Sequence, residues 1–524
     1  MDENASRKYY IQLRDGLTDR GFLKRIGVTR KAMLSAFEAA DLKKIAANVC
    51  AAIAGSRPVN GAFHIPATAE EQTPIDVLDL TAAVLPLLEE LKRAGEITDT
   101  PDKGDWLQYA YETMLARLFP VPEAQVYADS ERPGAVILFE MLHVILRQER
   151  RERNMIPTFD LDMLKKSEAR ECVSGGEYLR FLRRSREYYI FELHVIASRI
   201  TPFNTLSHVA GVHYVAMHMA RQLAARQVPV DLAMVSAAAA THDIGKFGCR
   251  GDEVLRLPHL HYYYTDEFLQ RMGMPGVAHI ASNHSTWDLE LENLSCENLL
   301  LIYADFRVKG SRDEEGREVA RFYTMKEAFD VILNKLEKVD EAKRNRYQRV
   351  YEKLYDFEQY LISIGVSPDL EQVGDQPRCW TDAALLDAEA AKERLKYLAI
   401  EHNIHVMNRF GSDSDFGDLL EEAKSGRNWQ NIHAYLNTLE EYFPYMTSVQ
   451  KQMTIGFLRE LLIHKGGDIR RQAAGLIGRI IAGYDERYRK ELPPGIRVPE
   501  ERIDSFKLWE EHLRVVIDTD LKRT

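Results

Sequence analysis

The stretch LAMVSAAAATHDIGK, residues 232–246, decides the fold of the central part of this 524-residue chain. Its first ten residues are apolar or small and include neither glycine nor proline, which predicts a buried helix over Leu232–Thr241. The run ends in the adjacent pair His242 and Asp243, and Gly245 follows as a natural helix terminator. A buried helix that ends in His-Asp places two metal-ligand side chains on a rigid support.

Most of the remaining chain has the apolar spacing of amphipathic helices. In the segment 77–93, apolar residues recur three and four positions apart and predict one broad buried face: Leu78, Leu80, Val84, Leu85, Leu88 and Leu91. Alternating strand patterns are scarce. The sequence therefore predicts an all-α fold with at most short hairpins.

Breaks rich in glycine, proline and polar residues divide the chain into units. They cover residues 54–74, 156–174 and 364–382, of which the first lies inside an N-terminal helical region. A chain of 524 residues is also too long for one ordinary core. We predict an N-terminal helical region at 1–160, a central helical unit at 175–365 and a C-terminal helical region at 380–524.

The C-terminal region contains one segment, Asp468–Gly478, that resembles the second helix of a HEAT repeat. Its aspartate can cap the helix, and its small residues permit close stacking. Helical repeats of this kind imply a surface for a protein partner. Because such repeats normally occur in groups of about three, we expect the chain to be the N-terminal part of a longer repeat protein.

Composition limits the other possibilities. The net charge of −11 argues against broad nucleic-acid binding, which is therefore not the favoured partner. No apolar run reaches the ~18 residues of a membrane span. Five widely separated cysteines without a CxxC pair argue against a disulfide framework. We expect a cytoplasmic protein without a membrane partner.

The central unit supplies six candidate metal ligands in chain order: His208, His242, Asp243, His261, His284 and Asp305. Imidazole and carboxylate together suit divalent Mn, Fe, Ni, Co or Zn, and Mg when carboxylate and water predominate. Asp305 ends an apolar run, where burying an acid is costly unless it is paired or bound to a metal. Isolated histidines are more often structural, which is the role we expect for His194, His213, His218, His259 and His279.

In this order and spacing the sequence resembles the HD superfamily of metal-dependent phosphohydrolases. The family pattern of a His, an adjacent His-Asp and a later Asp matches His208, His242–Asp243 and Asp305, and the string HDIGK is among the more specific short motifs of this superfamily. The close resemblance covers about residues 207–310. It implies a central HD-domain helical bundle, in which these residues bind a metal, and hydrolysis of a phosphate ester. The implied enzyme is a phosphodiesterase or phosphatase acting on a nucleotide or cyclic nucleotide.

His261 and His284 are similar to the extra histidines of the HD-GYP phosphodiesterases and of the HD domain of ribonuclease Y. In this chain Thr265, Asn283 and Ser285 replace residues of that pattern, and the GYP signature is absent. The resemblance implies one or two bound ions, with Asp243 as the bridging ligand if there are two.

The same resemblance suggests roles for nearby cations. Lys246 follows the His-Asp pair by about one turn, and we expect it to act with Asp243 in catalysis and to bind substrate phosphate. Arg307 and Lys309 follow Asp305 and are further candidates for substrate binding, although they equally suit a solvated surface. The run Tyr262–Tyr264 fits either stacking on a base or helix packing.

The sequence is also compatible with two other functions. Some HD-fold proteins are di-iron oxygenases that use the same ligands. An HD domain flanked by helical repeats also fits a ligand-sensing regulatory or scaffold protein.

Overall fold

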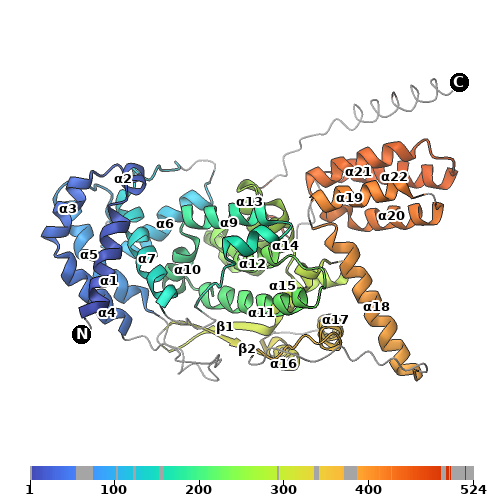
Figure 1. The fold of residues 1–524 in the computed structure, drawn as a ribbon, viewed down its shortest axis with the longest axis horizontal. Coiled ribbons are helices and arrows are strands. Elements are labelled where there is room, and N and C mark those ends of the chain that lie inside the picture. Colours follow the sequence, from blue (N-terminus) through green and yellow to red (C-terminus); the bar gives the residue numbers. More distant parts are fainter. Residues whose placement is uncertain are drawn as a thin grey trace.

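The computed structural model describes residues 3–54, 75–101, 104–121, 125–152, 159–291, 294–314, 316–335, 341–370, 386–411, 413–426, 428–484 and 491–494, together with 496 and 514. These residues form an all-α fold with a single two-stranded hairpin, as the sequence predicts (Figure 1). Nearly all of the loop expected at 54–74, and parts of the other two predicted breaks, lie outside the described residues.

Seven helices form the N-terminal part: α1 (Glu3–Leu17), α2 (Arg20–Ile26), α3 (Arg30–Ala39), α4 (Leu42–Ala54), α5 (Val77–Arg93), α6 (Trp106–Leu118) and α7 (Pro133–Glu152). The helix predicted at 77–93 is confirmed with the same bounds. Its start is fixed by Asp76, whose carboxylate accepts a hydrogen bond from Leu78 N at 2.9 Å. The predicted face is correct for Leu80, Val84, Leu88 and Leu91, whereas Leu78 is 44% exposed.

The central part contains these helices and short 3-10 turns: α8 (Lys166–Glu171), α9 (Gly175–Glu187), α10 (Ile190–Ile200), α11 (Leu206–Ala225), α12 (Leu232–Thr241), η2 (Ile244–Gly248), η3 (Gly251–Arg256), α13 (Leu257–Arg271), α14 (Pro275–Ser282), η4 (Thr286–Leu291), α15 (Cys296–Arg307), α16 (Met325–Lys335) and α17 (Glu341–Ser363). The predicted helix Leu232–Thr241 is confirmed as α12. Its run of small residues, Ala237–Ala240, is fully buried and lets α11 and α14 pack closely against it.

The hairpin consists of β1 (Val308–Arg312) and β2 (Glu318–Phe322), which pair antiparallel with Gly310 opposite Ala320. It packs against α11. A Cβ atom on Gly310 would lie 2.4 Å from Asn204 Nδ2, so a larger residue there would displace the Asn204 side chain. The hairpin therefore closes over the start of α11, where the first candidate ligand lies.

The C-terminal part comprises α18 (Ala388–Asn408), α19 (Asp413–Ser425), α20 (Trp429–Tyr442), η5 (Phe443–Tyr445), α21 (Ser448–Leu461) and α22 (Gly467–Ala482). The helix predicted within 468–478 is part of α22. Figure 1 shows α19 to α22 grouped at one end of the molecule, with the long α18 leading to them.

Two large apolar cores, and a small third cluster of Cys249, Leu257 and Leu260, hold these parts together. One continuous cluster of buried residues runs from Tyr9 to Ile404, so the N-terminal and central helices share a core, and a second runs from Met407 to Ile481. Asn408 joins them, since its Oδ1 accepts from Cys296 N at 3.0 Å. Across the described residues, every helix is too short or too polar to cross a lipid bilayer.

Candidate metal centre

The start of α11 places His208. The helix begins after Thr205, whose side chain makes no capping bond, and the buried carboxylate of Glu318 on β2 takes over that role. Glu318 accepts from the backbone N–H groups of Thr205 and Ser207 at 2.7 and 3.1 Å. These bonds tie the hairpin to the helix turn that carries His208 and so fix the position of its ring.

The end of α12 places His242 and Asp243. The chain turns there into η2, which lies so close to α13 that a Cβ atom on Gly245 would be 1.9 Å from the His261 carbonyl oxygen. Glycine is therefore required at this position. Thr265 on α13 secures the turn, since its hydroxyl donates to the His242 carbonyl at 3.0 Å and accepts from Gly245 N at 3.1 Å. The close contact between η2 and α13 brings His261 up to the His-Asp pair.

Three of the four histidines are oriented in the same way. The Nδ1 atoms of His242, His261 and His284 lie 2.9, 2.8 and 2.6 Å from the carbonyl oxygens of Ala239, Leu257 and Ala281. A carbonyl only accepts, so Nδ1 carries the hydrogen and the Nε2 lone pair of the neutral ring points the other way. All three Nε2 atoms therefore face the centre of the site, as metal-ligating histidines do when their other nitrogen donates to the backbone.

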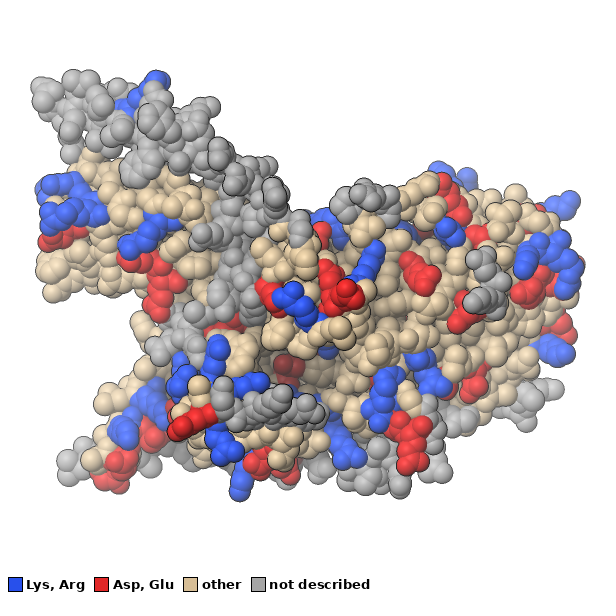
Figure 2. Space-filling view, turned by 180° about the vertical axis from the view of Figure 1, so that it is seen from behind, with Lys and Arg blue, Asp and Glu red and all other residues tan. Residues whose placement is uncertain are grey.

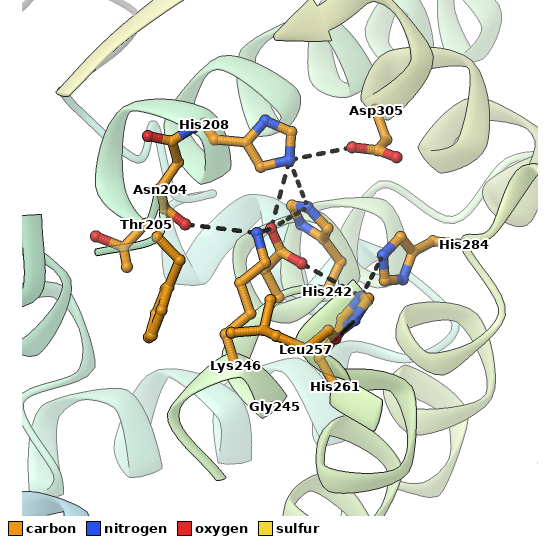
Figure 3. A network of polar contacts seen from close by, with 12 residues as sticks. Asn204, Thr205, His208, His242, Gly245, Lys246, Leu257, His261, His284 and Asp305 are labelled. Carbon is orange, nitrogen blue, oxygen red and sulfur yellow. Dashed lines mark hydrogen bonds and ion pairs between the residues drawn. The ribbon is translucent and has the colours of Figure 1, made fainter. Parts of the chain in front are cut away.

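Figure 3 shows the rings of His208, His242, His261 and His284 close together, and Asp243 contacts three of them. Its Oδ2 atom is 3.4 Å from Nε2 of both His208 and His242, and its Oδ1 atom is 3.5 Å from Nε2 of His261. Two buried groups result, one of His208, His242 and Asp243 and the other of Asp243, His261 and His284, and the ligand atoms of each lie within 4.8 Å of one another. Each group can hold a metal ion, and Asp243 belongs to both.

The Nε2 atoms of neighbouring histidines lie close together in the site. The Nε2 atoms of His242 and His208 are 3.4 Å apart, and those of His261 and His284 are 3.3 Å apart. His261 and His284 both donate through Nδ1, so their neutral rings turn lone pairs toward each other at this distance, and a shared cation relieves the repulsion. The residues present thus fit divalent metal ions.

Burial and neighbouring charges shift the pKa values of the candidate ligands toward the protonation states that bind a metal. Burial alone would raise the pKa of Asp243, but Lys246 and His242 hold this pKa well below its ordinary value. Burial lowers the pKa of His208, and it lowers that of His284 strongly. For His242 burial acts in the same direction, but the Asp243 carboxylate outweighs it and raises the pKa. The carboxylate is thus ionised and His208 and His284 are neutral, which is the state that binds a metal.

Asp305 approaches from α15 on the His208 side. Its Oδ1 atom is 3.0 Å from His208 Nε2, and its side chain is 26% exposed. Burial would raise its pKa, whereas the hydrogen bond from His208 and the charge of Lys309 hold that pKa below its ordinary value. Asp305 therefore lies at the open side of the first group of ligands, outside the two buried groups themselves.

The three predicted cations have different surroundings. Lys246 Nζ lies 2.5 Å from Asp243 Oδ2, and Lys309 Nζ donates to the Asp305 carbonyl at 2.9 Å. Arg307 is buried, and its guanidinium donates to the carbonyl oxygens of Tyr323 and Pro368 at 2.7 and 2.8 Å. Through these contacts Arg307 links α15 to the residues after β2 and to Pro368, and they do not support the predicted contact with phosphate. Lys246 and Lys309, in contrast, lie beside the candidate ligands.

The structure thus brings all six predicted ligands together at one site. Of the tyrosines, Tyr262 packs on the rings of His261 and His284, with ring centroids 3.9 and 4.8 Å away, so it supports the ligands. Among the histidines expected to be structural, His194 and His213 are buried and His259 is exposed. Sequence reasoning missed Glu318, because nothing in a hairpin sequence shows that it caps a distant helix.

Comparison of the chain with protein-family models, with curated proteins and with solved structures finds no match. The face of the molecule seen in Figure 2 has lysine and arginine interspersed with aspartate and glutamate. Phosphate backbones bind to continuous basic surfaces, and this face offers none among the described residues.

Proposed function

We propose that this protein is a metal-dependent phosphohydrolase that acts on a nucleotide or a cyclic nucleotide. The observation that carries the proposal is the position of Asp243, whose two carboxylate oxygens serve two separate groups of buried histidines. Such sharing is what a pair of metal ions ~3.5–4 Å apart requires of a bridging ligand. The resemblance of residues 242–246 to the HD superfamily points to the same chemistry.

His208, His242, Asp243 and Asp305 would hold one ion, and Asp243, His261 and His284 a second. Bound divalent Mn, Fe, Ni, Co, Zn or Mg supplies an activated water and polarises a phosphoryl oxygen. The chain's own contribution is orientation, because the bonds from Nδ1 of His242, His261 and His284 to backbone carbonyls fix the rings before any substrate arrives.

Lys246 and Lys309 supply positive charge on two sides of the site. Lys246 is held by Asp243 and by the Asn204 carbonyl, which is 3.4 Å from its Nζ atom. A lysine fixed in this way can bind a phosphate oxygen and stabilise the negative charge that grows there. Two flanking cations beside a buried ligand set suit a small phosphorylated substrate. They favour hydrolysis over a purely structural role.

The proposal is tested by incubating the metal-loaded protein with a panel of nucleoside phosphates, cyclic nucleotides and dinucleotides and measuring the release of product. We expect turnover of at least one of them, lost in Asp243→Asn and kept in Asp252→Asn, a matched exposed aspartate on η3. Oxygen consumption without phosphate chemistry would replace the proposal by a di-iron oxygenase. Tight binding without turnover would replace it by a sensor or scaffold.

A further inference from the structure

The short helix α14 ends beside one candidate ligand of the second ion, His284. It has 8 residues, and its C-cap is Asn283, the residue that precedes His284. Near its end, the carbonyl oxygen of Ala281 lies 2.6 Å from Nδ1 of His284 and holds the ring. A ligand ring that is oriented by a backbone carbonyl keeps its direction only while that carbonyl stays in place. The position of α14 therefore decides where the Nε2 atom of His284 lies.

The C-terminal part of the chain contacts α14 through a tyrosine. Tyr442, the last residue of α20, is 5% exposed, and its hydroxyl oxygen lies 2.8 Å from Nε2 of His279 on α14. The rings of Tyr442 and Tyr445 also lie edge-on to this histidine, with ring centroids 5.7 and 6.5 Å away. The same helix packs on α12, α13 and α15 of the central part. His279 thus links α14 to the C-terminal helices by a hydrogen bond and by ring contacts.

Hydrogen bonds continue from His279 toward the candidate ligand. The Nδ2 atom of Asn283 donates to the carbonyl oxygen of His279 at 2.8 Å, which closes the end of α14. The carbonyl oxygen of Asn283 accepts in turn from Asn298 Nδ2 on α15, at 3.4 Å. Asn283 and Asn298 are 7% and 1% exposed, so their amides depend on protein partners. A continuous series of contacts therefore runs from Tyr442 to the residue that precedes His284.

We infer that Tyr442 is a positioning residue for the second metal ion, so that the C-terminal helices are needed for full affinity at that position. The Tyr442 hydroxyl holds His279, and α14 then keeps His284 turned toward the other ligands of its group. The first group of ligands comes from α11 and from the end of α12, so it lies outside this series of contacts. The inference rests on the metal centre of the proposed function and adds a role for the C-terminal part of the chain.

The test is calorimetric titration of the metal-free protein, as the full chain, with Mn²⁺. Tyr442→Phe removes the hydroxyl that contacts His279 and keeps the buried ring. Tyr435→Phe is the matched control, because Tyr435 lies on the same helix and its hydroxyl donates to the exposed Glu422 at 3.0 Å. Circular dichroism establishes that each variant is folded.

We expect about two Mn²⁺ per chain in the wild type and in Tyr435→Phe, with the same affinities. In Tyr442→Phe the first ion should bind as in the wild type and the second about tenfold more weakly, as when a group that orients a metal ligand is lost. His279→Leu should weaken the second ion to a similar degree. Combining Tyr442→Phe with His279→Leu should add little, because both substitutions break one contact.

Wild-type affinity for both ions in Tyr442→Phe would overturn the inference. Equal weakening of both ions would also overturn it, because the variant would then only loosen the fold, and so would fully additive effects of Tyr442→Phe and His279→Leu. Wild-type protein that binds fewer than two Mn²⁺ would overturn the inference together with the proposed pair of ions. Two ions bound as expected, without turnover of any phosphate substrate, would support the inference and contradict the proposed hydrolysis alone.

Discussion

His261 and His284 face each other across the site with their Nε2 atoms 3.3 Å apart, while the Nδ1 atom of each ring is held by a backbone carbonyl. His261 lies on α13 and His284 follows the end of α14. A turn at Gly273 joins these two helices. Two neutral imidazoles arranged in this way turn their ligand atoms to one point. Their relationship is the structural reason for proposing a second ion beside the one that His208 and His242 could hold.

Replacement of His261 by alanine therefore removes one ligand of the second group and none of the first. We predict that His261→Ala lowers the metal content from about two ions per chain to about one. His259→Ala is the matched control, because His259 is exposed on the same helix. Elemental analysis of both variants checks the prediction, and an unchanged content in His261→Ala would place that residue outside the metal centre.

Lys246→Gln tests the role of the cation beside Asp243. The side chain is kept nearly the same length while its charge is lost, so metal content should stay at the wild-type value and kcat should fall by about 10²-fold, as when a charge-stabilising donor is removed. The exposed Lys392 on α18 provides the control Lys392→Gln. Wild-type kcat in Lys246→Gln would show that this lysine only balances the charge of Asp243.

Glu318 should matter for stability and for the position of His208. Glu318→Ala leaves the N–H groups of Thr205 and Ser207 buried without their acceptor, and we predict a loss of about 1–3 kcal/mol in the free energy of unfolding. Weaker metal binding should accompany it because the start of α11 loosens. Glu314→Ala, an exposed residue of the same hairpin, should change neither quantity in denaturant titrations and metal-binding assays. Identical unfolding midpoints for the two variants would contradict this account.

Glu297 gives a pH dependence with a definite sign. Its pKa is about 7 in the folded protein, raised by burial from the ordinary value of 4.5. Between these two values the unfolded chain loses the proton first, so the native state binds more protons and stability falls as pH rises through this window. Above pH ~7 the ionised Glu297 lowers the free energy of unfolding by its full amount, which is at most about 3 kcal/mol.

The glutamine of Glu297→Gln keeps an oxygen that accepts a hydrogen bond from Asp231 N, and its side chain stays neutral at every pH. We predict that it unfolds at higher denaturant concentration than the wild type at pH 8 and at a similar concentration at pH 4.5. Glu89→Gln, the same change at an exposed glutamate on α5, should follow the wild type at both values. Parallel curves for wild type and Glu297→Gln would show that Glu297 ionises normally in the folded state.

The sequence predicted those features that depend on local pattern. The bounds of α5 and α12 are correct because their apolar spacing and the capping residues Asp76 and Asp231 lie within a few positions of each other. Leu78 is exposed although it follows the pattern, whereas Val77 beside it is buried and belongs to the face that packs on the neighbouring helices. The six candidate ligands could be selected from the sequence because they stand in a motif order that it displays directly, and the structure brings their side chains to one place.

What the sequence did not reveal depends on contacts between distant segments. Glu318 caps α11 from 113 residues away, as measured to Thr205. Arg307 follows Asp305 closely, yet its side chain turns to the carbonyls of Tyr323 and Pro368, and only the packing of β2 decides that direction.

The most direct test of the central claim is the metal content of the wild-type protein and of Asp243→Asn, purified without chelator and measured by elemental analysis. Asp243 belongs to both groups of ligands, so we predict about two divalent ions per chain in the wild type and loss of both in a variant that remains helical by circular dichroism. Wild-type protein that stays free of metal after reconstitution, or an Asp243→Asn variant that keeps its full metal content, would contradict the account.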